Sequence, residues 1–220
     1  MCGRFSLSGS PDLYADYFET DQVLTEAISP SYNVAPTDWV YVVAEKEGKR
    51  SLGRMRWGLR THWSDTASHI NARMETAATR PAFRDAFRRK RCLIPADGFY
   101  EWERREGRRL PHWIFRADGY PLAFAGLWAS WKDPEGDWVR SCAIVTTAAQ
   151  GVVAPLHDRM PVALRPEVWS DWLDRTRTSP AEVSELLRPI DAELLMEYRV
   201  APLVNSVKNN GSELVRPVSV

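Results

Sequence analysis

Long apolar runs are missing from this chain of 220 residues, and so is an excess of either charge. No stretch approaches the roughly eighteen apolar residues of a membrane helix, and the N-terminus has no apolar signal segment, so we expect a cytoplasmic protein without membrane contacts. Lysine and arginine number 29, as do aspartate and glutamate. A balanced chain has no global field for nonspecific duplex binding, so any contact with nucleic acid must be local.

Cysteine is also scarce, with only Cys2, Cys92 and Cys142. Three cysteines cannot all pair, and no CxxC or HxxxH spacing suggests zinc, so we expect a reducing compartment and neither metal nor cofactor. Cys92 and Cys142 lie in apolar runs, where cysteine is more often a small buried hydrophobe than a reagent. Cys2 is different because it follows the initiator methionine.

The position of Cys2 carries a specific chemistry. Methionine is normally removed before a small residue, which would leave a terminal cysteine with a free amine and a thiol. The pKa of an α-amine is about 7.7–8.0 and that of a free thiol about 8.5, so part of each is nucleophilic at neutral pH. The amine can condense with an aldehyde to an imine, and the thiol can close a thiazolidine on the same carbon. The position favours an aldehyde substrate, and the alternative is an accident of the start codon.

Composition and length predict one folded domain over residues 1–220. Hydrophobic residues make up 44% of the chain, and no repeat or low-complexity segment occurs, which excludes disordered and fibrous classes. A domain of this length buries about 70% of the surface of its unfolded chain. We expect a monomer, since no motif for an obligate protein partner is evident.

The hydrophobic pattern predicts an α+β fold. Strands are expected where β-branched and aromatic residues lie between turn signals, at Trp39–Ala44, Leu110–Phe115, Leu122–Trp131 and Trp138–Thr147. Helices are expected at Pro11–Glu19, Thr79–Arg89, Arg165–Arg175 and Pro180–Leu187. Consecutive strands in the middle and helices at the flanks indicate a curved, mainly antiparallel, barrel-like sheet.

The segment from His69 to Thr76 places an amide and a guanidinium two residues apart, as Asn71 and Arg73. On an extended segment both point the same way, so Asn71 could bond a ligand while Arg73 binds a phosphate. The alternative is a loop in which Asn71 caps its own turn and Arg73 pairs with Glu75.

Two further segments hold titratable groups. In Asp97-Gly98-Phe99-Tyr100-Glu101-Trp102 the aromatic neighbours of Glu101 should raise its pKa toward neutrality, which suits a general acid or base. A strand residue facing water is the alternative. In the proline-bracketed segment 155–161, His157 could transfer protons near neutral pH and Arg159 could bind a phosphate. Here the alternative is a solvated turn in which His157 pairs with Asp158.

Aromatic residues are abundant, with ten tryptophans. Trp57 and Trp63 are interleaved with arginine and glycine, a pattern typical of surfaces on which the bases of single-stranded nucleic acid stack. Most other tryptophans, including Trp113, Trp128 and Trp138, are expected in the core.

Together these motifs resemble the SOS response-associated peptidase family, and they occur in the same order along essentially the whole chain. The matching segments are Met1-Cys2-Gly3-Arg4-Phe5, Tyr32-Asn33-Val34-Ala35-Pro36, Trp57-Gly58, Ile70-Asn71-Ala72-Arg73-Met74-Glu75-Thr76, Asp97-Gly98-Phe99-Tyr100-Glu101-Trp102, Leu156-His157-Asp158-Arg159-Met160-Pro161 and Val207-Lys208-Asn209-Asn210-Gly211.

The resemblance implies a protein of the DNA damage response that binds single-stranded DNA at an abasic site. Mature Cys2 would form a thiazolidine crosslink with the aldehyde of the ring-opened sugar and shield the lesion. Catalytic roles are implied for Cys2, Asn71, Glu101 and His157. Phosphate contacts are implied for Arg4, Arg73 and Arg159, and contacts with flanking bases for Asn33, Pro36, Trp57 and Trp63.

Two rival functions remain open. The family name implies a cysteine-type peptidase that removes its own Met1 with Cys2, Glu101 and His157. The resemblance is also compatible with lyase-like chemistry at the abasic site. The other rival is a module that binds single-stranded or modified DNA without chemistry.

Overall fold

The computed structural model describes residues 2–60, 69–133 and 135–218. Its strands are β1 (Phe5–Leu7), β2 (Gln22–Val23), β3 (Ser31–Val34), β4 (Trp39–Lys46), β5 (Lys49–Trp57), β6 (Asn71–Arg73), β7 (Arg91–Ala96), β8 (Gly98–Arg105), β9 (Arg108–Arg116), β10 (Leu122–Lys132), β11 (Trp138–Ala148), β12 (Arg159–Pro161) and β13 (Leu195–Arg199). The α-helices are α1 (Pro11–Tyr17), α2 (Met74–Ala77), α3 (Arg84–Arg89), α4 (Trp169–Leu173) and α5 (Pro180–Glu185). Short 3₁₀ turns are η1 (Gly151–Val153), η2 (Pro166–Val168), η3 (Ala192–Leu194), η4 (Pro202–Asn205) and η5 (Ser212–Val215).

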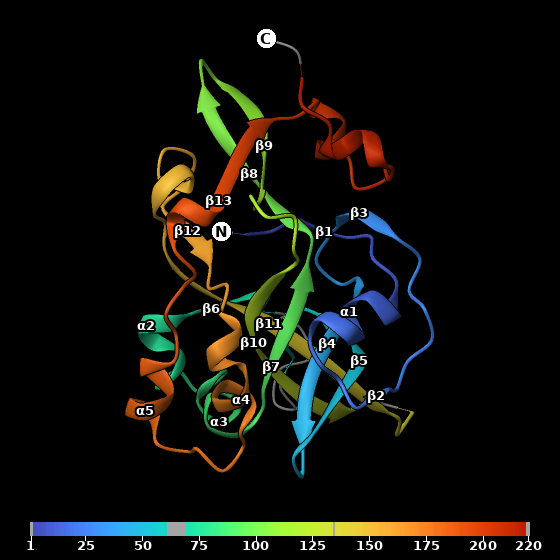
Figure 1. The fold of residues 1–220 in the computed structure, drawn as a ribbon, viewed down its shortest axis with the longest axis vertical. Helices are drawn as coiled ribbons and strands as arrows, with labels where there is room; N and C mark the ends of the chain where they lie inside the picture. Colours follow the sequence, from blue (N-terminus) through green and yellow to red (C-terminus); the bar gives the residue numbers. More distant parts are fainter. Residues whose placement is uncertain (1, 61–68, 134, 219–220) are drawn as a thin grey trace.

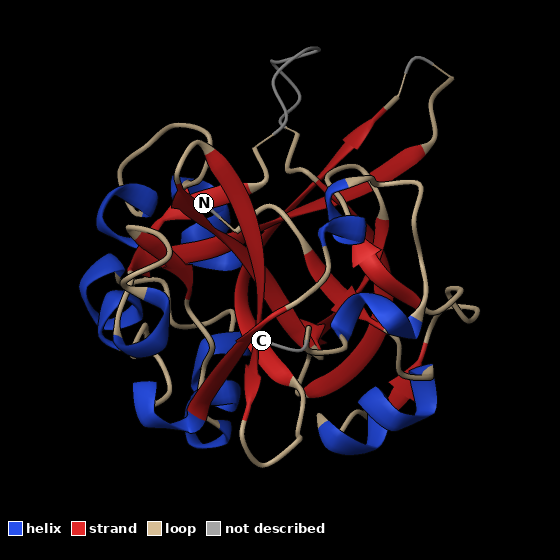
Figure 2. Ribbon diagram, turned by 90° about the horizontal axis from the view of Figure 1, so that it is seen from above, coloured by secondary structure: helices blue, strands red, loops and turns tan. Residues whose placement is uncertain are grey.

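β5 pairs with β4 on one side and with β11 on the other, and this double pairing closes the larger sheet into a barrel. The remaining barrel strands follow in the order β11, β10, β7 and β4 and are antiparallel to one another, whereas β11 and β5 pair in parallel. A second sheet has the order β13, β9, β8, β1 and β3. Helices lie around the outside of the strands (Figure 2). The α+β class and the barrel-like, mainly antiparallel core that the sequence predicts are confirmed.

Aromatic side chains of β1 and β8 join the two sheets. The ring of Phe5 lies 5.0 Å from that of Trp57 and 6.0 Å from that of Phe124, and Phe99 of β8 packs against Phe124 as well. A smaller apolar cluster around Tyr100 and Trp113 holds the C-terminal segment against the second sheet, above β3 in Figure 1. The N-terminal strand is therefore fixed between the barrel and the second sheet.

The predicted strands agree with β4, β9, β10 and β11, and three of the predicted helices agree with α1, α5 and the pair η2–α4. The predicted helix from Thr79 is wrong at its start, because α3 begins only at Arg84. Turns precede it and bring Phe83 into the core, where its ring packs 5.2 Å from that of His69. Burial of a large side chain overrides local helix propensity at this point.

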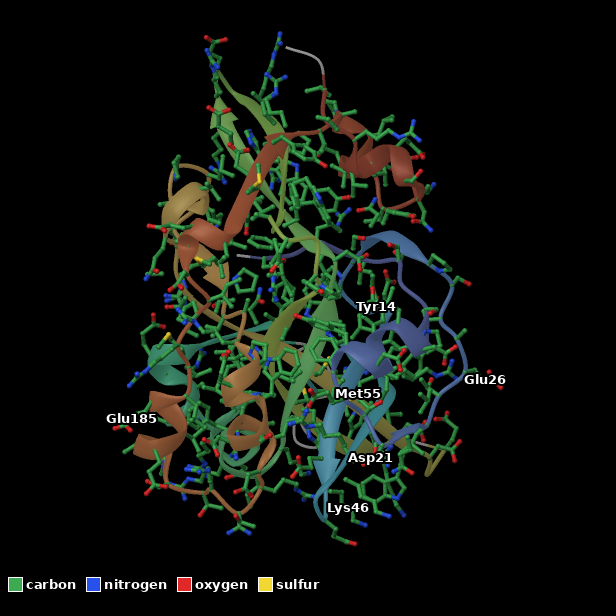
Figure 3. The ribbon with its side chains drawn as sticks, in the orientation of Figure 1. Tyr14, Asp21, Glu26, Lys46, Met55 and Glu185 are labelled. Carbon is green, nitrogen blue, oxygen red and sulfur yellow. The ribbon has the colours of Figure 1, made fainter. Side chains whose placement is uncertain are left out.

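Figure 3 shows the side chains, with Tyr14 of α1 directed into the body and Lys46 and Glu185 at its outside. The expectation of a core tryptophan is wrong for Trp138, which is 67% exposed near the end of the β10–β11 hairpin. Among the described residues, no helix is long and apolar enough to cross a membrane. Within those same ranges, no group of three or more histidine, cysteine, aspartate or glutamate side chains could hold a metal ion.

Candidate active site

Asp97, in the turn between β7 and β8, holds the N-terminal strand in place. Its Oδ2 accepts the Ser6 hydroxyl at 2.7 Å, the Ser8 N–H at 2.7 Å and the Ser8 hydroxyl at 2.8 Å. Its Oδ1 accepts the Tyr14 hydroxyl at 2.6 Å. Hydrogen bonds to a charged acceptor are about twice as strong as those between neutral groups. Four such bonds fix β1, and with it the direction in which the chain leads back to Cys2.

Cys2, three residues before the start of β1, is fully buried. The Asn71 amide donates to the Cys2 carbonyl oxygen at 2.8 Å, and the Cys2 thiol lies 3.9 Å from the Arg4 carbonyl oxygen. Asn71 reaches this position because β6 pairs with β11 beside the barrel. Burial raises the pKa of the Cys2 thiol, and the nearby charge of Glu101 raises it further. At neutral pH the thiol is therefore protonated in this environment.

Glu101 lies on β8 and is only 2% exposed. Burial raises its pKa from 4.5 to about 7. The negative charge of Asp158 adds to this increase, and the positive charge of Arg109 opposes it. The carboxyl group can thus gain or lose a proton near neutral pH, which is what a general acid or base requires. The alternative of a strand residue facing water does not hold.

Glu101 and His157 line one cleft of about 670 Å³. Its other lining residues are Gly3, Arg4, Trp102, Arg104, Arg109, Pro155, Leu156 and Asn205. Burial lowers the pKa of His157, so the ring is neutral at pH 7. Its Nδ1 accepts the Arg159 N–H at 2.9 Å and also lies 2.7 Å from an Asp158 carboxylate oxygen. The first contact needs an Nδ1 without a proton, and the second needs a protonated Nδ1. Protonation of the ring would therefore replace the Arg159 N–H with the Asp158 carboxylate as the partner of Nδ1.

Arg4 and Asn33 are tied to the C-terminal segment. Arg4 donates from Nη1 to Asn33 Oδ1 at 2.6 Å and to the Val204 carbonyl at 3.0 Å. The Asn33 amide donates to the carbonyls of Ser206 and Asn209, both at 2.9 Å. Asn33 is buried and its side chain is used within the fold, so its contact with DNA stays a prediction. Arg4 lines the cleft, where a phosphate could reach it.

The two other predicted phosphate ligands differ in their surroundings. Arg159 makes a two-pronged ion pair with Glu75, at 2.7 and 2.9 Å, and donates to the Thr146 carbonyl at 2.6 Å. Arg73 is exposed. Glu75 therefore pairs with Arg159, in place of the pair with Arg73 that was one alternative.

The predicted base-stacking residues are not gathered at the cleft. Trp57 is fully buried, and its indole N–H donates to the Ile70 carbonyl at 3.0 Å, so this conformation offers no face of the ring to a base. Pro36 is half-buried after β3. Trp63 lies outside the described residues. Contacts of these residues with bases stay predictions.

Trp102, Arg104 and Arg109 line the cleft but are not among the site residues that the sequence predicts. The Trp102 indole donates to the Asn205 side chain at 2.7 Å, and the Arg109 guanidinium lies 5.4 Å from the centre of the Trp102 ring. The concentration of arginine between positions 104 and 109 was the sequence feature that could have indicated this part of the cleft.

A family model described as SOS response associated peptidase (SRAP) matches residues 1–207. The chain belongs to this family. An SRAP relative from Bacillus subtilis, abasic site processing protein YoqW, is 41% identical over 98% of this chain and 99% of its own. Abasic site processing protein YedK of Escherichia coli is 35% identical over 99% of this chain and 100% of its own.

Solved structures show the same fold. A protein of Bacteroides thetaiotaomicron superposes with a TM-score of 0.87 over 99% of this chain and 100% of its own, at 23% identity. A protein of Bordetella bronchiseptica does so with a TM-score of 0.77 over 91% and 100%, at 27% identity. The SRAP fold is therefore kept where most of the sequence has changed.

Proposed function

We propose that the protein processes abasic sites in single-stranded DNA by forming a thiazolidine crosslink through Cys2. The observation that carries this proposal is the Asn71 hydrogen bond that holds Cys2 beside a buried Glu101. The names of the relatives YoqW and YedK, abasic site processing proteins, agree with it.

The proposed reaction needs no external reagent. Once Met1 is removed, the Cys2 amine attacks the C1′ aldehyde of the open sugar, and the carbinolamine loses water to give an imine. The Cys2 thiol then adds to the imine carbon while its proton passes to nitrogen. One C–N bond and one C–S bond have formed at C1′, and one water has left.

Glu101 is proposed to move the protons of this sequence. Loss of water from the carbinolamine needs an acid, and addition of the thiol needs a base. A carboxyl group with a pKa of about 7 is present in both forms at neutral pH. The raised pKa of the thiol makes such a base necessary, because the thiol does not ionise unaided.

Asn71 and His157 are proposed to position the reactants. The Asn71 amide fixes the Cys2 carbonyl, which restricts rotation of the residue that carries both nucleophiles. His157 lines the same cleft as Gly3 and Arg4, where a neutral ring could hydrogen-bond the sugar. Arg4, Arg73 and Arg159 are proposed to bind phosphates, and Asn33, Pro36, Trp57 and Trp63 to contact flanking bases.

Burial of the thiol favours this proposal over a general cysteine peptidase. A peptidase of that class depends on a thiolate whose pKa is lowered by its surroundings. Here burial and Glu101 raise the pKa of Cys2. The amine attacks first in the crosslinking reaction, so that reaction does not begin from a thiolate.

The deciding experiment compares Cys2→Ala with Cys142→Ala, since both thiols are buried in the native protein. Each protein, with removal of Met1 confirmed by mass spectrometry, is incubated with an abasic oligonucleotide and run on a denaturing gel. We expect no heat-stable adduct for Cys2→Ala and a normal adduct for Cys142→Ala. Attachment through Cys92 or Cys142, or trans cleavage of unrelated peptides without any adduct, would contradict the proposal.

A further inference from the structure

The wall of the barrel is interrupted along one side of β5. β2 pairs with the first half of this strand, at Ser51 and Leu52, and β11 pairs with its end, at Arg56 and Trp57. Among the residues that the structure describes, no strand pairs with Gly53–Met55 on this side. Three residues of a barrel strand thus keep a free edge.

The backbone of Arg54 faces this interruption. In an antiparallel pair, alternate residues of a strand direct their N–H and C=O groups toward the partner. The Trp57 N–H donates to the carbonyl of Asp38, which precedes β4, so the odd-numbered residues of β5 face β4. Even-numbered residues face the other side, where the Leu52 carbonyl accepts the Leu24 N–H at 2.8 Å. Arg54 follows Leu52 by two residues, so its N–H and C=O point into the interruption.

A hollow of about 500 Å³ lies at this edge, between the segment 24–26, strands β4 and β5, and the start of β11. β11 begins at Trp138 but pairs with β5 only from Ser141, so the two strands diverge here. Leu24 and Trp138 both line the hollow and are 65% and 67% exposed. A Cβ on Gly53 would have no neighbour within 4 Å. The hollow therefore offers apolar surface and room for a side chain beside a free backbone edge.

The charge of the hollow is positive. Arg54 and Arg140 line it together with a single acidic residue, Glu26. In the part of the chain that the structure describes, neither arginine forms an ion pair with a carboxylate. The guanidinium groups of Arg54 and Arg56 lie 5.1 and 4.4 Å from the centre of the Trp39 ring, which places a third positive charge close by. This surface is therefore complementary to an acidic partner.

We propose that an extended, acidic segment of another protein docks in this hollow as an added strand beside Arg54. Exposed sheet edges bind extended peptides through main-chain hydrogen bonds, and pockets beside the edge select alternate side chains. The interruption runs from Leu52 to Arg56, about 13 Å at roughly 3.3 Å per residue, which is enough for a short strand. β2 and β5 lie at the lower right of Figure 1 and β8 and β9 at its top, so the docking surface is separate from the cleft.

The free edge distinguishes this partner from a nucleic acid. Arginine beside tryptophan also suits the bases and phosphates of a single strand. A nucleic acid, however, has no backbone amides with which to continue the hydrogen-bond ladder of a sheet. A peptide strand supplies both an acceptor for the Arg54 N–H and a donor for its carbonyl. The backbone geometry therefore favours a protein segment.

The test uses labelled peptides of about six residues, an ordinary strand length, in which aspartate and glutamate alternate with valine and isoleucine. A second peptide has lysine at the acidic positions. Two more carry N-methyl groups on alternate backbone amides, either of the acidic or of the apolar residues. Binding to the full chain is measured by fluorescence anisotropy. The variant Arg54→Ala/Arg140→Ala is compared with a matched control, Arg88→Ala/Arg89→Ala, which removes two exposed arginines of α3.

We expect the Arg54→Ala/Arg140→Ala variant to bind the acidic peptide about tenfold more weakly than wild type, and the control to match wild type. The lysine peptide should not bind. Methylation of one alternate set of amides should abolish binding and methylation of the other should leave it intact, because only alternate residues face the edge. Affinity for an oligonucleotide with a tetrahydrofuran abasic analogue, which has no aldehyde, should be the same in all three proteins. This last measurement reports on the proposed function separately from the docking surface.

Four results would overturn the inference. The first is a wild-type protein that does not bind the acidic peptide, or a variant that binds it as well as the control does. The second is an equal effect of the two methylation patterns, which would show that the edge of β5 is not used. Displacement of the peptide by a thymidine oligonucleotide would identify a nucleic acid as the occupant. A wild-type dimer in sedimentation equilibrium that the Arg54→Ala/Arg140→Ala variant does not form would identify a second copy of the chain.

Discussion

Two carboxylates four positions apart, Asp97 and Glu101, have opposite surroundings. Asp97 accepts four hydrogen bonds from the N-terminal segment and α1. Glu101 lies in a buried position where the loss of water raises its pKa to about 7. Donors stabilise the charged form of a carboxyl group and burial destabilises it. One short segment thus holds a carboxylate that fixes the structure and a carboxyl group that can exchange a proton.

The largest effect is expected when the structural carboxylate is removed. Asp97→Ala leaves the hydroxyls of Ser6 and Ser8 and the Ser8 N–H without their acceptor. We expect the free energy of unfolding to fall by about 3 kcal/mol, measured by urea denaturation. A loss below about 1 kcal/mol would show that water replaces Asp97 as the acceptor and that Asp97, unlike the comparison with Glu101 assumes, does not fix the structure.

Glu101→Gln should raise the free energy of unfolding above pH 7, whereas Asp97→Ala lowers it. The folded protein holds Glu101 at a pKa of about 7, above the ordinary value of 4.5, so its charged form is disfavoured in the fold. The protonated group contributes to the free energy of unfolding. This contribution is fully present below about pH 4.5 and is lost as the pH rises through 7. Above pH 7 the glutamine variant should be more stable than wild type by about 2 kcal/mol, with no gain near pH 4. Parallel stability curves for the two proteins would contradict the raised pKa.

The crosslinking rate tests the same group kinetically. We expect Glu101→Gln to keep its affinity for the abasic analogue and to form the adduct about a hundredfold more slowly. The logarithm of the wild-type rate should bend near pH 7, and the bend should be missing in the variant. Equal rates for the two proteins between about pH 5 and pH 8 would remove Glu101 from the chemistry.

The smallest effect on stability is expected when one of the four hydrogen bonds to Asp97 is removed. Tyr14→Phe keeps the buried ring but removes the hydroxyl that donates to Asp97 at 2.6 Å and accepts the Gly9 N–H at 3.0 Å. We expect a loss of about 1 kcal/mol in the free energy of unfolding. In a double-mutant cycle with Asp97→Ala the two losses should not add, and full additivity would show that the hydroxyl acts independently of Asp97.

Local pattern predicted four of the thirteen strands of the described residues, β4, β9, β10 and β11, together with α1, α5 and the pair η2–α4. β9, β10 and β11 are long, with apolar residues between clear turn signals, and Ser10-Pro11 marks the start of α1, where the Ser10 hydroxyl accepts the Leu13 N–H at 3.2 Å. Local pattern could not predict the closure of the barrel, because β5 and β11 pair although more than eighty residues of sequence separate them. The start of α3 was misplaced for a similar reason, since tertiary burial of Phe83 decides it.

The candidate site was also predictable only where neighbours in the sequence determine the environment of a residue. The aromatic neighbours of Glu101 indicated a raised pKa, and the structure agrees. The partners of Arg159 and Asn33 could not be read from the sequence, because Glu75 and the C-terminal carbonyls are remote in the chain. Whether a tryptophan is exposed also depends on the packing of strands, as the buried Trp57 and the exposed Trp138 show.

The bonds between the two ends of the chain have a consequence for synthesis on the ribosome. Asn33, which holds Arg4, is satisfied by carbonyls of Val204, Ser206 and Asn209. A nascent chain lacks these acceptors until residues 204–209 emerge, so the hydrogen bonds that hold Arg4 at the cleft form after the barrel strands have been synthesised. Translation that stops before residue 204 therefore yields a product that lacks the carbonyl groups which hold Arg4 and Asn33 at the cleft.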